Sequence, residues 1–132
     1  MAQLSAPNML RYRIGDLGEA PMAVAAVIWK GAALGFTGNN TVRPLVATDK
    51  FAGFADDSYD TTKGSTVARF KKKGQIVLTV AGLAANTPVG TSVYASDDHT
   101  FTLTATSNSL IGKIASVDDA THATVAFNAA LI

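Results

Sequence analysis

Apolar residues in this chain recur at every second position, and no long stretch repeats them with the 3.6-residue period of a helix. In the segment QIVLTV, Ile76, Leu78 and Val80 fall on one face and the alternate positions fall on the other. A period of two is that of a half-buried β-strand, because successive side chains of a strand point to opposite faces. The pattern therefore predicts strands.

Further segments of this kind are rich in β-branched and aromatic residues, and Gly, Asn, Asp or Pro separates them, as is typical of strands joined by turns. Many short strands at close spacing indicate an all-β fold, a small β-barrel or sandwich of short antiparallel strands. Helix is expected only as a turn or two near 86–88. The expected strands cover 23–30, 31–37, 42–48, 51–55, 66–72, 75–80, 91–95, 99–106, 110–117 and 122–129.

The first residues of the chain lack this alternation and mix Pro, Gly, charged and scattered apolar side chains. We therefore predict an extended N-terminal arm over 1–19, followed by a single β-barrel domain over 20–132. An arm with no core of its own either frays or is ordered by a partner. Its RYR triplet, Arg11, Tyr12 and Arg13, is a candidate partner contact, since Tyr and Arg are over-represented at the energetic centres of interfaces.

Trp29 and Lys30 form a second candidate contact, at the end of the first expected strand. Two interpretations stay open for this pair. Trp29 is either an interface anchor or a core residue, and in the second case the stem of Lys30 lies along the apolar surface while its ammonium group reaches water.

Composition narrows the function classes. The 132 residues suffice for one domain with a core, and a net charge of +1 with 16% charged residues gives no strong attraction to nucleic acid or membrane. Cysteine is absent, which excludes a disulfide framework, a thiol nucleophile and any Cys-ligated metal. Much of the 48% hydrophobic content is alanine, which buries little area, so we expect association with other chains to supply part of the stability. The start lacks the apolar stretch of a signal peptide, which predicts synthesis in the cytoplasm.

The segment that most resembles a catalytic or cation-binding site is Asp97-Asp98-His99, which lies between two expected strands. The pairs Asp56-Asp57 and Asp118-Asp119 also follow strands, and Asp is favoured in turns because its side chain bonds nearby backbone groups. General acid/base catalysis instead needs two carboxylates at a defined separation, in environments that split their pKa values. We interpret all three pairs as turn residues, with an adventitious cation site as the main alternative for Asp97-Asp98-His99.

Other catalytic templates are missing from the sequence: it has no nucleophile elbow, phosphate-binding loop or zinc-protease motif. His99 and His122 have no matching ligand spacing, so we predict no catalytic residue, no metal and no cofactor, and the chain is not expected to be an enzyme. The basic run RFKKKGQ lacks interleaved aromatics and is interpreted as a solvated hairpin end rather than a nucleic-acid contact.

Taken in order, five segments resemble the small capsid decoration (cement) proteins of tailed bacteriophages. In that family a strand with a Lys-Gly pair opens the barrel, an F-x-G-F/V-A strand leads to an acidic loop, and a later VYASDD-x-TFT segment pairs with S-x-I-G-x-V. The resemblance covers roughly 24–127 and depends on order and spacing, since each piece alone is ordinary strand and turn material. The segments are IWKGAALGF, FAGFADDSYD, KKKGQIVLTVAG, VGTSVYASDDHTFTLT and SLIGKIASV with ATVAF.

The resemblance implies a structural virion protein that is made in the bacterial host and binds the outer surface of the phage head. It implies a homotrimer that contacts the major capsid protein and bridges neighbouring capsomers, with no nucleic-acid or membrane partner. The family has no catalytic residues to transfer and no sharp binding motif. The alternative is a ligand- or carbohydrate-binding β-barrel module of a phage tail or surface structure, for which 8% aromatic residues and one Trp are thin support.

Overall fold

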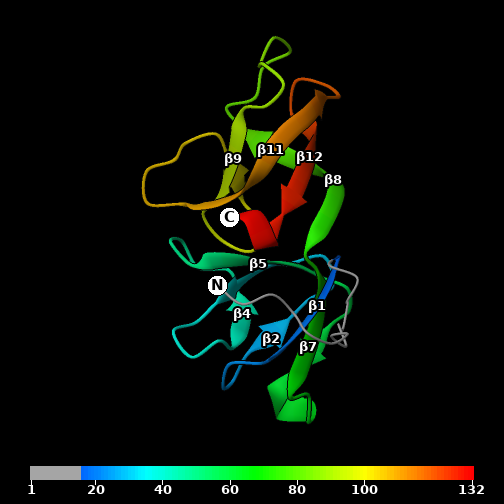
Figure 1. Ribbon diagram of the computed structural model, residues 1–132, viewed down its shortest axis with the longest axis vertical. Coiled ribbons are helices and arrows are strands. Elements are labelled where there is room, and N and C mark those ends of the chain that lie inside the picture. Colours follow the sequence, from blue (N-terminus) through cyan, green and yellow to red (C-terminus); the bar gives the residue numbers. More distant parts are fainter. Residues whose placement is uncertain (1–15) are drawn as a thin grey trace, which may run out of the picture.

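The computed structural model describes residues 16–132, and this part of the chain is nearly all β (Figure 1). The all-β prediction is therefore confirmed. Two 3₁₀ turns, η1 (Thr61–Lys63) and η2 (Ala129–Leu131), are the helical elements of the described residues. The strands are β1 (Leu17–Pro21), β2 (Val27–Ile28), β3 (Ala33–Phe36), β4 (Val42–Pro44), β5 (Lys50–Ala55), β6 (Tyr59–Asp60), β7 (Val67–Lys71), β8 (Lys73–Ala81), β9 (Ser92–Ala95), β10 (Phe101–Thr102), β11 (Ser109–Val117) and β12 (His122–Asn128).

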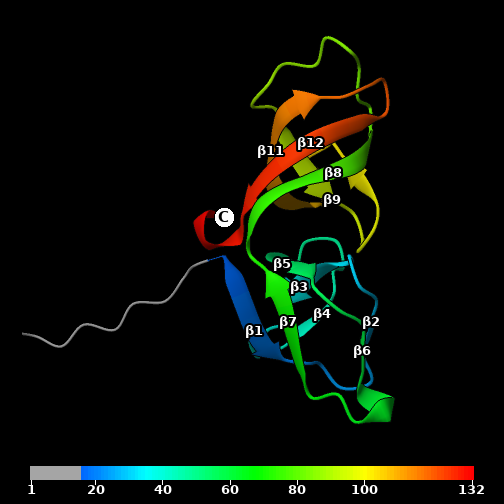
Figure 2. The same ribbon diagram turned by 90° about the vertical axis from the view of Figure 1, so that its right-hand side faces the viewer.

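The strands form two bodies stacked along the long axis of the molecule (Figure 1, Figure 2). The sheet half, residues 16–71, contains a five-stranded sheet of order β1-β7-β5-β3-β4 and a small β2-β6 ribbon. The barrel half, residues 73–132, closes five strands in the order β10-β8-β12-β11-β9. Lys72 joins the two: its N–H donates to the Asp16 carbonyl at 2.7 Å, and its carbonyl accepts from Ala129 N–H at 2.7 Å. The chain thus passes from sheet to barrel without a break.

Pairing between strands is antiparallel with one exception in the barrel. Strand β12 runs antiparallel to β8 over seven residue pairs, from His122 opposite Thr79 to Asn128 opposite Lys73. The exception is β10, which runs parallel to β8, with Phe101 opposite Val80. This short parallel contact closes the barrel.

Three predicted strands are much shorter than expected, and that over 42–48 is reduced to Val42–Pro44. Over 99–106 only Phe101 and Thr102 pair, because the hydroxyl of Thr102 accepts the N–H of Thr104 and turns the backbone away from the ladder. Over 23–30 only Val27 and Ile28 pair, since the alanine-rich run before them turns at Ala25, which has φ +58°.

The predicted arm boundary at residue 19 is wrong. Strand β1 begins at Leu17, opposite Lys71, so the last three residues of the expected arm belong to the sheet. Gly18 allows this close pairing, because a Cβ there would lie 2.4 Å from the ring of Phe70. Residues 1–15, with Arg11, Tyr12 and Arg13, lie outside the described residues.

The helical turn expected near 86–88 is also wrong. The two 3₁₀ turns within residues 16–132 are η1 and η2, and neither lies near 86–88. The side chains of Asp60 and Asn128 cap these turns by accepting hydrogen bonds from the N–H groups of Thr62 and Ala130. No helix within residues 16–132 has the length and hydropathy to cross a bilayer.

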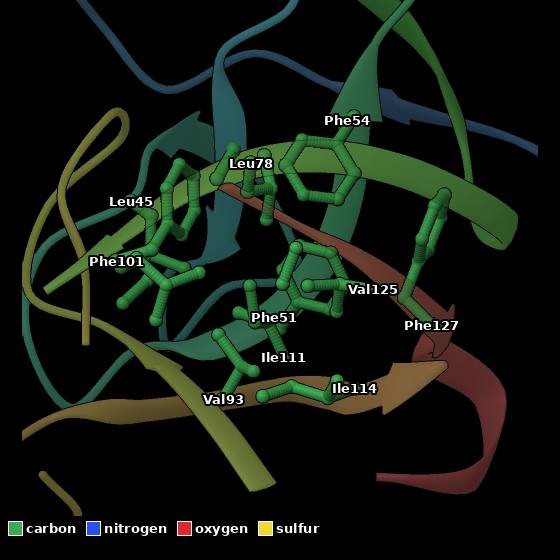
Figure 3. Close-up of a cluster of buried hydrophobic side chains, with 14 of the residues drawn as sticks. Leu45, Phe51, Phe54, Leu78, Val93, Phe101, Ile111, Ile114, Val125 and Phe127 are labelled. Atoms are coloured by element: carbon green, nitrogen blue, oxygen red, sulfur yellow. The ribbon is translucent and has the colours of Figure 1, made fainter. Parts of the chain in front are cut away.

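The larger of two hydrophobic clusters crosses between the halves (Figure 3). Phe51 and Phe54 of β5 point into it, and the ring of Phe54 lies 4.9 Å from that of Phe127 and 6.2 Å from that of Phe101. The smaller cluster lies inside the sheet half, and five of its ten buried residues are alanine. The barrel therefore covers one face of the sheet and supplies most of the large apolar side chains.

Candidate functional site

Trp29 lies on a tight turn between β2 and β3 and is 69% exposed. Its carbonyl accepts the N–H of Ala32 at 3.0 Å, and Gly31 has φ +87°, a left-handed conformation that suits glycine. The N–H of Gly31 donates to the Ala55 carbonyl at 3.0 Å and ties the turn to β5. The core interpretation of Trp29 is therefore wrong: a rigid turn presents its indole to solvent.

Two acidic loops hydrogen-bond to this turn and to Ala33, which follows it. The N–H of Lys30 donates to Ser58 Oγ at 3.0 Å, so the turn lies against the loop that carries Asp56 and Asp57. The N–H of Ala33 donates to the Asp98 carbonyl at 2.9 Å, which brings the Asp97-Asp98-His99 loop to the same region. We call Trp29, Asp56, Asp57 and Asp98 the Trp29 knob.

The Asp97-Asp98-His99 segment is a turn built on the side chain of Asp97. Its Oδ1 accepts the N–H groups of His99 at 2.9 Å and Thr100 at 2.7 Å, and its Oδ2 accepts the Thr100 hydroxyl at 3.1 Å. Partial burial alone would raise the pKa of Asp97, but these hydrogen bonds outweigh it and hold the pKa below its usual value. The predicted turn role is confirmed.

His99 completes this loop. Its Nδ1 lies 2.9 Å from Asp98 Oδ1, and this hydrogen bond, followed by the charge of Asp97, raises the pKa of His99 above its usual value. The ligand atoms of Asp97, Asp98 and His99 lie within 4.8 Å of one another, close enough to contact one cation. Because both Asp97 oxygens already accept hydrogen bonds, the arrangement is accounted for by the turn alone.

The other acidic pairs follow the same rule. Asp119 Oδ1 accepts the N–H groups of Thr121 and His122, both at 2.8 Å, and these bonds hold the pKa of Asp119 far below its usual value. Asp57 Oδ1 accepts Ser58 N–H at 2.7 Å. These carboxylates fix strand exits, as the sequence predicted.

A groove on the barrel half is a second candidate site. It has a volume of about 600 Å³ and lies where the start of β8, the middle of β11 and the end of β12 meet the C-terminal turn. The charged side chains in its lining, Lys73 and Lys113, are both positive, and Leu131 beside them is 83% exposed. Its lining includes Lys73, Leu110, Lys113, Ala126, Phe127 and Leu131.

The sequence pattern did not predict this groove, because β8 is distant in sequence from the β11–β12 hairpin that completes it. The basic run does reach it, but the expected hairpin end is wrong. Lys71 ends β7, Lys72 joins the two halves and Lys73 begins β8, so the run spans the passage from sheet to barrel. The alternation of apolar and polar residues does not reveal where the chain leaves the sheet and enters the barrel, because the backbone stays extended from β7 through Lys72 into β8.

The sequence candidates thus separate into two groups. Trp29 and Lys30 lie together on one exposed turn, whereas Arg11, Tyr12 and Arg13 lie outside the described residues. Comparisons with protein-family models, with curated proteins and with solved structures found no match for the chain.

Proposed function

We propose that the chain is a non-catalytic structural protein of a phage particle, which binds the outer surface of the head and cements neighbouring capsomers. The order of five sequence segments supports the family, and the observation that carries a binding role is the exposed Trp29 on a hydrogen-bonded turn. Because the backbone of this turn is already hydrogen-bonded, little backbone entropy is lost when a partner covers Trp29, and Trp is enriched at energetic centres of interfaces.

The proposed shell contacts are Arg11, Tyr12 and Arg13 of the N-terminal segment, with Trp29 and Lys30 as the contacts within the described residues. The partner is the major capsid protein, which presents the same surface many times on an icosahedral head. A trimer that engages several shell subunits at once gains avidity of roughly 10²- to 10⁴-fold where the geometry allows simultaneous contact.

Such a protein stabilises a shell by simple linkage. A ligand that binds the assembled shell and not its separated subunits adds about 2.7 kcal/mol per site at a hundredfold excess over Kd. Summed over a lattice of sites, this modest contribution opposes the pressure of packaged DNA. The role requires a stable body and a contact surface, and it requires no bond-making residues.

The experiment is co-sedimentation of the full-length protein with mature phage heads, compared with a variant that lacks residues 1–13. We expect the deletion to weaken head binding at least tenfold and to leave the melting temperature unchanged, because the β1 strand begins after it, at Leu17. Gln3→Ala/Asn8→Ala is the matched control on the same segment and should bind like the wild type. Full head binding by the deletion variant would contradict the proposed contact.

A second candidate function is a carbohydrate-binding module. The observation in its favour is that Trp29, a flat ring in solvent, lies beside the carboxylate-bearing loop of Asp56 and Asp57. Binding in a glycan array that is lost in Trp29→Ala, together with no affinity for heads, would favour this alternative over the head protein.

A further inference from the structure

We infer that copies of this chain associate head to tail, with the Trp29 knob of one copy seated in the groove of the next. In this arrangement a second copy covers Trp29, and the shell contacts of the proposed function are then those of Arg11, Tyr12 and Arg13. The inference depends on the geometry of two surfaces of this chain and not on head binding, so either proposal can fail alone.

The groove offers an apolar floor with positive borders. Leu110, Ala126 and Phe127 supply apolar lining, and Lys73 and Lys113 supply the charged side chains. A volume of about 600 Å³ is ample for one indole ring and the loop that carries it. Leu131 stands at this site with 83% of its surface in water, so a partner that covers the groove also removes a large apolar side chain from solvent.

The Trp29 knob has an exposed aromatic side chain and acidic residues, which complement the apolar lining and the lysines of the groove. Trp29 is exposed on a turn whose following residues, Lys30 and Ala33, hydrogen-bond to the loops that carry Asp56, Asp57 and Asp98. Lys30, which is positive, and His99, which is positive when protonated, lie in the same region, so the loops are acidic on balance rather than uniformly. Seating the knob would bring its carboxylates toward Lys73 and Lys113 while the indole enters the apolar floor, and opposite potentials of this kind also steer encounter.

The two surfaces lie on opposite sides of the molecule. Figure 2 shows β2 and β6, which flank the knob, on one side, and the C-terminal turn, which borders the groove, on the other. A copy therefore cannot fill its own groove. Contact between two different surfaces is heterologous, and it closes into a ring when the rotation between copies allows closure. A closed ring of three is compatible with the expected trimer.

Charge also decides between a second copy and the N-terminal segment of the chain. That segment carries Arg11 and Arg13 beside its apolar residues, and Lys73 and Lys113 would repel them. The knob carries carboxylates instead. The groove is therefore matched to the knob of another copy.

Trp29 is the single tryptophan of the chain, so its fluorescence tests the contact in unmodified protein. We expect the emission to shift to shorter wavelength as concentration rises, in step with an increase in mass by sedimentation velocity, because the indole leaves water on association. Added salt should reverse both changes, since exposed charge pairs are screened. An oligomer in which Trp29 emission stays that of a solvated indole would overturn the inference, as would a monomer at every concentration measured.

Three variants test the two surfaces separately, without heads. Trp29→Ala should weaken association about 30-fold, the effect of a strong interface anchor. Lys73→Glu/Lys113→Glu should abolish association at low salt, and Leu131→Ser should weaken it. All four positions are exposed, so the melting temperatures should stay those of the wild type.

The decisive experiment mixes a knob variant with a groove variant. Trp29→Ala keeps an intact groove, and Lys73→Glu/Lys113→Glu keeps an intact knob, so the two variants should be monomeric alone and form a one-to-one complex together. Lys50→Glu/Lys63→Glu makes the same charge change at exposed positions outside both surfaces and should associate like the wild type. Failure of the mixture to associate, or equal weakening by the control, would overturn the inference.

Discussion

The sheet half and the barrel half reach stability by different means. In the sheet half the buried cluster is half alanine, with Phe70 as its one buried aromatic residue, and it forms on a sheet whose strands do not close. In the barrel half closure leaves no long unpaired edge, and large aliphatic and aromatic side chains fill the interior. The comparison indicates that the sheet half depends on the barrel for much of its apolar burial.

Strand β5 links the two halves, because its side chains belong to both hydrophobic clusters. Its register against β3 shifts between Leu34 and Gly35, so one extra residue is accommodated near Gly53, which has φ +147°. The bulge places Phe51 and Phe54, three positions apart, in the shared cluster, while Ala52 and Ala55 face the alanine-rich cluster. An unbroken period of two would send Phe51 and Phe54 to opposite faces.

Phe54→Ala is expected to have the largest effect. Its ring packs against those of Phe51 at 5.3 Å and Phe127 at 4.9 Å, so truncation opens a cavity between the halves and costs about 3–5 kcal/mol of unfolding free energy. Urea unfolding followed by Trp29 fluorescence, which reports on the sheet half, and by circular dichroism should shift together. Phe36→Ala, a half-buried control in the sheet half, should cost less. If the fluorescence transition moved to lower urea concentration and the circular dichroism transition did not, the barrel half would not depend on this contact.

Gly53→Ala tests the bulge itself. A Cβ at this position would lie 2.3 Å from the Lys71 carbonyl oxygen, at a φ that alanine disfavours, so we expect a loss of about 2–3 kcal/mol. Gly38→Ala is the matched control, because nothing lies within 4 Å of its Cβ position and its φ is not positive. Similar denaturation midpoints for the two variants would contradict the role assigned to Gly53.

Asp49→Ala should weaken the sheet half by about 2 kcal/mol. Asp49 is 9% exposed at its side chain, and it accepts from Arg43 Nε at 3.1 Å, Arg43 Nη2 at 2.8 Å and Val46 N–H at 3.1 Å. The comparison is Arg69→Ala, which removes the exposed Glu19–Arg69 pair and should cost less than about 1 kcal/mol. Equal losses in chemical denaturation would show that burial does not distinguish the two ion pairs.

Acid should act on the carboxylates that cap turns, with the smallest effect of this series; Asp97 and Asp119 are in the barrel half, and Asp60 is in the sheet half. The pKa values of Asp97 and Asp119 are lowered in the folded chain, so their contribution is present above the ordinary value of 3.8 and is lost as pH falls below it. Stability should therefore fall between about pH 5 and pH 2. Asp119→Asn keeps an acceptor for Thr121 and His122 N–H but cannot titrate, and it should reduce the fall. An unchanged pH dependence in this variant would contradict the assignment.

His99 titrates with the opposite sign. Its pKa is raised above the ordinary value of 6.5, so its stabilising interaction with Asp98 and Asp97 is complete below that value and is lost as pH rises through the folded-state pKa. NMR titration of the His99 ring should show a midpoint above 6.5. Asp98→Asn should lower that midpoint, because it removes the hydrogen-bonding carboxylate.

The sequence predicted what local chemistry decides. Alternation at Ile76, Leu78 and Val80 identified β8, and the acidic pairs identified strand exits, because strands and turns follow from neighbouring residues. What it missed depends on contacts between distant segments. The bulge at Gly53, the passage at Lys72 and the groove each need two or three strands in place, and the exposure of Trp29 depends on a turn held by β5.

The most direct test of the proposed function is electron microscopy of mature phage heads, imaged with and without saturating full-length protein. The account predicts protrusions on the outer surface, arranged with the symmetry of the shell, that disappear when residues 1–13 are deleted. Bare heads at saturation, with the protein intact and folded, would contradict it.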